Sequence, residues 1–320
     1  MIFLRRLVFL RYQYSEYKLE IEFIHRSSQC QLSPVGDVTW LNESVFAIGF
    51  QSGLVEIVDA EERRVVKSYV FDHPVHGLCG KCRHVNDIDL FIQLKGDKVL
   101  CLHVSEDQWD EVWTISCSTA ITFSKPILLD NGNILAFIAS GQTRIVFANT
   151  KNGTILHELD LALQPEAKGI VTGISRGSDS IFCLVESGKI VQIGLGDWVI
   201  KTNTVAFPVE PSIESIIPSS IETRNDGTCL IGFSNGSVRL RNSTDDLFKG
   251  ANGIGCIRTI PNSNLVILGT WKGELYFLDG FTNQCFRSPH ATNICQISVS
   301  PGNDRIAVAS TDSRVSIWSL

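Results

Sequence analysis

The chain has 320 residues, a formal net charge of −6, and 44% hydrophobic against 19% charged residues. Such a composition supplies a large buried core and excludes an intrinsically disordered chain. The longest apolar runs are of strand length and are broken by glycine or a charged residue well before the roughly 18 residues that a membrane span needs, so we expect no membrane insertion.

Residues 1–14 begin with the apolar stretch MIFLRRLVFLRY, which Arg5 and Arg6 interrupt. A secretory signal requires an uninterrupted apolar region, so none is predicted here. Most of the ten cysteines lie in apolar stretches, where they act as small hydrophobic side chains of a reducing compartment. We therefore expect the protein in the cytoplasm, the nucleus or both. The tail itself predicts an irregular start of uncertain role, with an amphipathic targeting segment as the alternative.

After the tail, one hairpin recurs seven times: an apolar run, a tight polar turn and a second apolar run. The copies are VFAIGFQSGLVEIVD, LFIQLKGDKVLCLHV, ILAFIASGQTRIVFANT, SIFCLVESGKIVQIGL, CLIGFSNGSVRLRN, LVILGTWKGELYFLD and RIAVASTDSRVSIWS. Their turn residues recur on average about every 40 to 45 residues, which is the length of one four-stranded propeller blade. The sequence therefore predicts an all-β, seven-bladed β-propeller, with residues 15–320 as a single domain.

A strand that precedes the first full repeat is predicted to close this ring. The last copy ends at Leu320 after a third strand, while LEIEFIH, residues 19–25, alternates like a strand that has no repeat of its own. An unpaired sheet edge invites aggregation, so the last blade needs a fourth strand. We expect residues near 17–25 to supply it.

The densest group of metal-ligating residue types follows the first repeat. It contains His73, His76, Cys79, Cys82 and His84. Histidine and cysteine at these spacings are competent zinc ligands. However, strand residues three apart point to opposite faces, and no second C-x-x-C pair completes the motif. A structural role is favoured, and zinc binding stays a weak alternative.

The repeat pattern is interrupted between Trp198 and Asn225, where three prolines occur. Proline removes a donor from a strand ladder. This stretch predicts a long connection between the fourth and fifth blades, and loops of this kind often carry recognition.

The end of the chain combines His290, Ser310, Asp312 and Trp318, which resembles a Ser/His/Asp catalytic set beside an aromatic ring. Asp312 lies in the last tight turn and Trp318 in the final strand. This spacing resembles the hydrogen-bonded structural tetrad of WD-repeat blades, in which buried polar groups satisfy one another. No nucleophile elbow accompanies Ser310, so a structural tetrad is favoured over a hydrolase site.

Basic residues recur in the tight turns although the chain is acidic. Because these turns share one face of a propeller, that face is predicted to be positive and to attract an acidic peptide, with Trp271 as an exposed aromatic anchor. The alternative is that turn positions are simply solvated, and that Trp271 packs over the next blade. The candidate binding face comprises Lys95, Lys189, Trp271, Lys272 and Arg314.

Three stretches resemble one group within the WD-repeat family. They are EAKGIVTGISRGSDSIFCLVESGKIVQI from Glu166, GIGCIRTIPNSNLVILGTWKGELYFLD from Gly253, and RIAVASTDSRVSIWSL at the end. The group comprises the guanine-nucleotide-binding-protein-β-like protein of animals and the ASTRA-associated WD-repeat subunit of fungi. The chain departs from the group's pattern at Lys272, where an aspartate is expected, and in keeping only Trp318 of the blade-ending tryptophans.

The resemblance implies a non-catalytic scaffold that acts with the TTT co-chaperone in maturing phosphatidylinositol-3-kinase-like kinases, or within an ASTRA-type chromatin-linked complex. Its partners would be other proteins, with this chain as a monomer in a larger assembly. No GxxxxGK[ST] phosphate loop occurs, so no nucleotide or other cofactor is expected, and the acidic balance disfavours nucleic acid. The alternatives are another WD-repeat scaffold, such as a coat, nuclear-pore or ubiquitin-ligase substrate receptor, or a zinc-binding protein.

Overall fold

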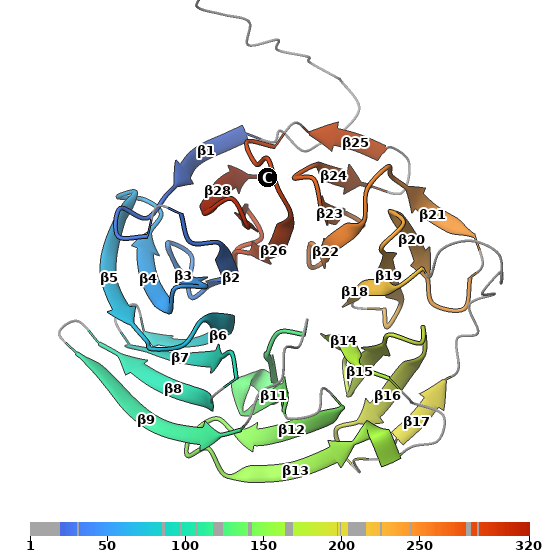
Figure 1. Ribbon diagram of the computed structural model, residues 1–320, viewed down its shortest axis with the longest axis horizontal. Coiled ribbons are helices and arrows are strands. Elements are labelled where there is room, and N and C mark those ends of the chain that lie inside the picture. The colour runs from blue at the N-terminus through green and yellow to red at the C-terminus, as the bar shows by residue number, and fades with distance from the viewer. Residues whose placement is uncertain are drawn as a thin grey trace, which may run out of the picture.

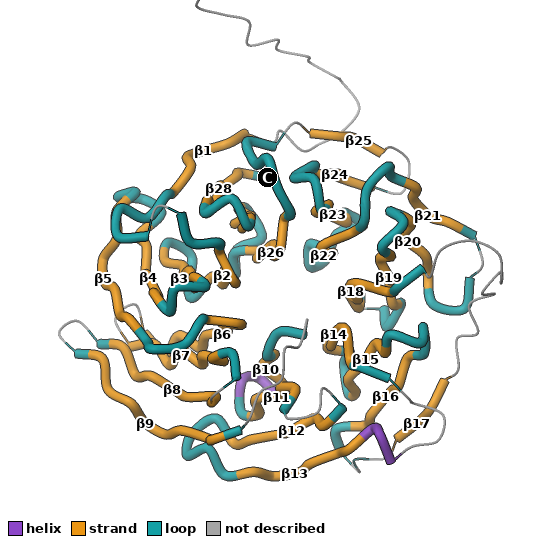
Figure 2. The backbone as a smooth tube through the Cα atoms, in the orientation of Figure 1, coloured by secondary structure: helices purple, strands orange, loops and turns teal. Residues whose placement is uncertain are grey.

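A computed structural model shows a ring of seven four-stranded antiparallel sheets (Figure 1). The structure describes residues 20–30, 32–84, 87–96, 98–105, 108–117, 124–139, 143–163, 169–196, 198, 200–203, 216–224, 226–243, 245–279, 283–286 and 288–320. Within these residues helix is confined to two short 3-10 turns, η1 (Asp130–Gly132) and η3 (Leu161–Leu163), and strands dominate the trace (Figure 2). The prediction of an all-β, seven-bladed propeller is confirmed.

Each blade is named by its order in the chain, and its strands are given from the channel outward. Blade 1 comprises β2 (Val35–Trp40), β3 (Val45–Phe50), β4 (Leu54–Asp59) and β5 (Arg64–Val70). Blade 2 comprises β6 (Val75–His84), β7 (Asp87–Leu94), β8 (Lys98–Val104) and β9 (Trp109–Ser116). Blade 3 comprises β10 (Ile127–Leu129), β11 (Ile134–Ile138), β12 (Arg144–Asn149) and β13 (Ile155–Asp160). Blade 4 comprises β14 (Val171–Arg176), β15 (Ser180–Val185), β16 (Ile190–Gly194) and β17 (Ile200–Asn203). Blade 5 comprises β18 (Pro218–Thr223), β19 (Cys229–Phe233), β20 (Ser237–Leu240) and β21 (Asp246–Lys249). Blade 6 comprises β22 (Ile254–Thr259), β23 (Val266–Thr270), β24 (Leu275–Leu278) and β25 (Asn283–Phe286). Blade 7 comprises β26 (Ile294–Val299), β27 (Arg305–Ser310), β28 (Arg314–Ser319) and β1 (Glu20–His25).

The ring closes as the sequence predicts, because β1 is the outer strand of blade 7. It pairs antiparallel with β28, from Glu20 opposite Ser319 to His25 opposite Val315. The contacts that close the ring extend into blade 1 at Glu56, which is 1% exposed. The Ser27 hydroxyl donates to Glu56 Oε1 over 2.6 Å, and His25 Nε2 lies 2.8 Å from Glu56 Oε2. Strand pairing and a buried carboxylate therefore both hold the two ends of the chain together.

The hydrophobic core lies between neighbouring blades. The cluster joining blades 7 and 1, for example, brings Trp40 and Phe46 together with Ala309 and Ile317. Because both faces of a blade are covered by its neighbours, the middle strands are continuous apolar runs rather than alternating ones, as in Leu90-Phe91-Ile92, which is 0% exposed throughout. This two-sided burial explains why the hairpin repeats were visible in the sequence.

The turns between the second and third strands of the blades share one face, which we call the turn face. In six blades the first N–H of the turn donates to the carbonyl just before the blade's inner strand. These bonds join Gln51 to Pro34, Lys95 to Pro74, Glu186 to Ile170, Ser234 to Ile217, Trp271 to Gly253 and Thr311 to Asn293. Glycine recurs in the turns because they require the left-handed region, with φ of 89° at Gly53 and 80° at Gly273, and in blade 7 Ser313 takes φ 69°.

Two sequence predictions fall partly on residues that are not described. The tail, residues 1–14, lies outside the described residues, and its role stays a prediction. Of the connection between blades 4 and 5, residues 204–215 are likewise outside them. None of the helical segments described is long and apolar enough to cross a membrane.

Candidate functional site

The predicted binding residues lie on the turn face, at four of the seven turns. Lys95 lies between β7 and β8, Lys189 precedes β16, Trp271 and Lys272 separate β23 from β24, and Arg314 begins β28. Among the described residues, no carboxylate forms an ion pair with Lys95, Lys189 or Lys272. Arg314 donates to the Pro289 carbonyl over 3.2 Å. The three lysines therefore leave their charge available on this face.

Trp271 both packs on its neighbour and faces solvent. Its ring lies so close to Gly253 that a Cβ at that position would come within 2.5 Å of the indole carbons. The side chain is nevertheless 46% exposed. One side of the indole packs on Gly253, and the other side is exposed to solvent. A side chain that is already held in place loses little conformational entropy on binding, so Trp271 is suited to anchor a partner.

The turn between the first and second strands lies at the other end of each blade, on what we call the opposite face. Carboxylates recur in these turns, at Glu43, Asp130, Asp179, Asp226 and Asp304. Basic residues also lie on this face, with Arg176 and Arg224 at the first turns of blades 4 and 5. The lysines of the turn face can attract an acidic partner.

Blade 7 contains a hydrogen-bonded chain of four side chains. His290 Nδ1 lies 3.2 Å from Asp312 Oδ1, His290 Nε2 lies 2.8 Å from Ser316 Oγ, and Trp318 Nε1 donates to Ser316 Oγ over 2.8 Å. Burial lowers the pKa of His290, and Asp312 opposes that shift only in part. A neutral imidazole that carries its proton on Nδ1 donates to Asp312 and accepts from Ser316, so every member is satisfied.

The hydroxyl in this chain is that of Ser316, whereas the sequence analysis placed Ser310 there. Ser310 instead donates to the Thr292 carbonyl over 3.2 Å and accepts from the Asp312 backbone N–H over 3.3 Å. Strand alternation could have found Ser316, since residues two apart on β28 share a face and Trp318 is two residues further on. Ser316 is 0% exposed, so the chain braces the blade rather than offering a nucleophile to solvent.

The histidine and cysteine group of blade 2 does not converge. His76, Cys79 and Cys82 lie along the single strand β6, while His73 precedes it, and the side chain of His84 is outside the described part. Burial and the nearby Lys125 lower the pKa of His76 to about 3, and burial raises the pKa of the Cys79 thiol. His76 Nε2 lies 2.9 Å from the Ser124 carbonyl, so this ring joins blades 2 and 3.

A different group of possible metal ligands occurs at the edge of the same blade. Among the described residues, Asp87, Asp89 and His103 are the one set of three whose ligand atoms lie within 4.8 Å of one another. His103 Nδ1 is 3.2 Å from Asp89 Oδ1 and 3.6 Å from Asp87 Oδ1. The sequence analysis missed this set because it spans two strands. Its signal is alternation on β7 together with the pairing of Asp89 with His103.

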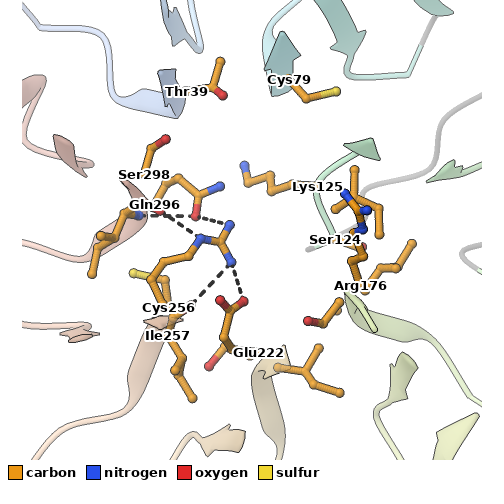
Figure 3. A pocket seen from close by; sticks show the side chains of 18 of the residues that line it. Thr39, Cys79, Ser124, Lys125, Arg176, Glu222, Cys256, Ile257, Gln296 and Ser298 are labelled. Carbon is orange, nitrogen blue, oxygen red and sulfur yellow. Dashed lines mark hydrogen bonds and ion pairs between the residues drawn. The ribbon is translucent and has the colours of Figure 1, made fainter. Parts of the chain in front are cut away.

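The seven inner strands surround a central cavity of about 420 Å³ (Figure 3). On the side of blades 5 to 7, Arg258 donates through NH1 to Glu222 over 3.0 Å, through NH2 to Gln296 over 3.0 Å, and through Nε to the Ile297 carbonyl over 2.9 Å. Glu222 also accepts from the Thr259 hydroxyl. These bonds tie blades 5, 6 and 7 together.

Lys125 reaches into the cavity from blade 3 on the other side (Figure 3). Its ammonium donates to the carbonyls of Gly36 and His76, which belong to blades 1 and 2. Asp37 is 0% exposed and accepts from the Leu78 N–H over 2.7 Å. Burial raises the pKa of Asp37, while Lys125 and a hydrogen bond from Gln296 act in the opposite direction.

Asp37, Lys125, Glu222, Arg258 and Gln296 thus form one set, which we call the channel network. It contacts blades 3, 2, 1, 7, 6 and 5 in turn around the ring, and it does not include blade 4. The inner strand of blade 4 contributes Arg176, which lines the cavity but makes no hydrogen bond or ion pair with a described residue.

In comparisons with known proteins, no protein-family model matches the chain, and no curated protein matches it.

Proposed function

We propose that this protein is a non-catalytic scaffold that binds partner proteins through its turn face. A β-propeller fits a scaffold or adaptor role in general, since its faces offer rigid sites for several partners. The observation that supports this particular face is Trp271, which is 46% exposed and lies on the same face as Lys95 and Lys189. It is followed by Lys272, which forms no ion pair with a described residue.

Within that class we propose a role in maturing phosphatidylinositol-3-kinase-like kinases with the TTT co-chaperone, or in an ASTRA-type chromatin-linked complex. The support is the resemblance in the stretches that begin at Glu166, Gly253 and Arg305. Such a role places the protein in the cytoplasm, the nucleus or both, as a monomer within a larger assembly. Its contribution would be to hold partners together, with no nucleotide, metal or membrane.

The test is recovery of partners by a tagged chain that carries Trp271→Ala and Lys272→Glu. We expect partner recovery to fall at least ten-fold relative to the unmodified chain, because the anchor is lost and the local charge is reversed. Identification of the co-purifying proteins tests the narrower role, which requires TTT subunits or a kinase of this class among them.

A matched control removes an equally exposed apolar side chain and reverses a lysine on another part of the surface. Ile155→Ala with Lys151→Glu does so at the start of β13 and in the turn before it, where Ile155 is 45% exposed. This control should retain its partners. Equal recovery of partners by the Trp271 variant and by the unmodified chain would show that these partners do not bind through the turn face.

A further inference from the structure

The opposite face carries a groove that continues the central cavity outward. A second cavity, of about 320 Å³, lies between the first turns of blades 5 and 6. It shares Thr259 and Pro261 with the central cavity. The two hollows therefore adjoin, and a chain that lies across blades 5 and 6 can reach the end of the channel.

Each part of this groove contains an arginine that the fold does not use. Arg176 ends β14 and lines the central cavity, and it lies on the channel side of the ring (Figure 3). Arg224 follows β18 in the neighbouring blade and lines the second cavity. Within the described residues, neither guanidinium group makes a hydrogen bond or ion pair, whereas Arg258 on β22 of blade 6 has acceptors for all three of its nitrogens.

Two carboxylates line the groove together with these arginines, and both accept hydrogen bonds. Glu222 accepts from Arg258 and from Thr259. Asp226 accepts from the Thr228 N–H over 2.8 Å within its own turn, and these hydrogen bonds, together with the charge of Arg224, lower its pKa. The described lining of the two cavities contains four basic side chains, Lys125, Arg176, Arg224 and Arg258, against the carboxylates of Glu222 and Asp226. The groove therefore has an excess of positive charge, with polar side chains from Thr259, Asn262 and Asn264 along its wall.

We propose that this groove binds an acidic segment of a partner protein, with carboxylates paired to Arg176 and Arg224. Guanidinium groups bind carboxylates through two parallel hydrogen bonds, which gives direction as well as charge. The carboxylates of the surrounding turns, at Asp130 and Asp179, disfavour a large polyanion such as nucleic acid, while a single extended peptide fits a groove between two turns. The site is separate from the turn face and does not depend on the function proposed for that face.

The experiment measures the anisotropy of a fluorescein-labelled peptide of alternating glutamate and glycine, titrated with the full chain at low salt. We expect saturable binding that weakens as salt increases, and at least ten-fold weaker binding by Arg176→Gln and by Arg224→Gln. Lys151→Gln, which removes one positive charge from another turn of the same face, should bind within two-fold of the unmodified chain. The Trp271→Ala, Lys272→Glu variant should also bind normally, which keeps this result distinct from the test of the turn face.

Four results would overturn the proposal. The first three are the absence of saturable binding, equal loss of affinity with Lys151→Gln and with Arg176→Gln, and equal binding of a peptide in which glutamine replaces glutamate. A peptide with phosphoserine in place of glutamate that bound more than ten-fold tighter would also overturn it, because the site would then be specific for phosphate.

Discussion

Blades 7 and 4 are built from the same four-strand repeat, yet they differ in how a polar side chain of the inner strand is paired at the channel. In blade 7, His290, Asp312, Ser316 and Trp318 bond to one another, and Gln296 belongs to the channel network. In blade 4, the corresponding inner strand ends at Arg176, whose guanidinium group makes no hydrogen bond or ion pair with a described residue. Polar groups that the fold has paired hold the blades in place, so those left unpaired are the ones available to a partner.

The physical reason for this contrast is the cost of burying a polar group without a partner. Loss of one partner leaves the other unsatisfied, at about 1–3 kcal/mol for a neutral group and more for a charged one. Blade 7 joins the two ends of the chain, where any loosening opens the ring. Its polar groups are accordingly buried and satisfied, with Ser316 at 0% and His290 at 6% exposed.

The largest effect should come from removing the strand that completes blade 7. Deletion of residues 1–27 removes β1, exposes the edge of β28, and leaves the buried Glu56 without Ser27 and His25. We expect the free energy of unfolding to fall by about 5 kcal/mol, of which about 3 comes from the unpaired carboxylate. Deletion of residues 1–14 alone is the control and should have little effect. A melting temperature unchanged by the longer deletion would contradict the proposed closure.

A smaller effect should follow from Ser316→Ala, which takes one hydroxyl out of the chain in blade 7. His290 Nε2 and Trp318 Nε1 then lose their shared partner, so the free energy of unfolding should fall by about 2.5 kcal/mol in a denaturant titration. Ser178→Ala is the matched change in blade 4, where the side chain is exposed and, among the described residues, bonds only to Asp179. That variant should stay within about 0.5 kcal/mol of the unmodified chain. An equal loss in the free energy of unfolding for the two serine variants would contradict the proposed difference between blades 7 and 4.

The ring could be predicted from the sequence because each blade is buried on both faces. This burial requires the same apolar hairpin in every blade, so the pattern repeats along the chain. The closing strand was predictable as well, because residues 19–25 alternate without a repeat of their own. Three members of the blade 7 chain were predictable from their spacing, whereas Ser316 required the strand register.

The channel network could not be predicted from local sequence patterns. Asp37, Lys125, Glu222, Arg258 and Gln296 are separated by long stretches of chain, and each looks like an ordinary polar residue in or near a strand. Only closure of the ring brings them together. That Arg176 and Arg224 form no ion pair with a described residue is hidden for the same reason, because it depends on which partners the other charged groups bind.

The most direct test of this account compares Arg258→Met with Arg176→Met, two arginines that line the same cavity. Arg258→Met leaves Glu222 and Gln296 without their partner, whereas Arg176→Met removes a side chain that pairs with no described residue. We expect the first change to lower the free energy of unfolding by about 2 kcal/mol or more, and the second to change it by less than about 0.5 kcal/mol. Equal losses, or a larger loss at Arg176, would contradict the claim that the channel network braces six blades and excludes the fourth.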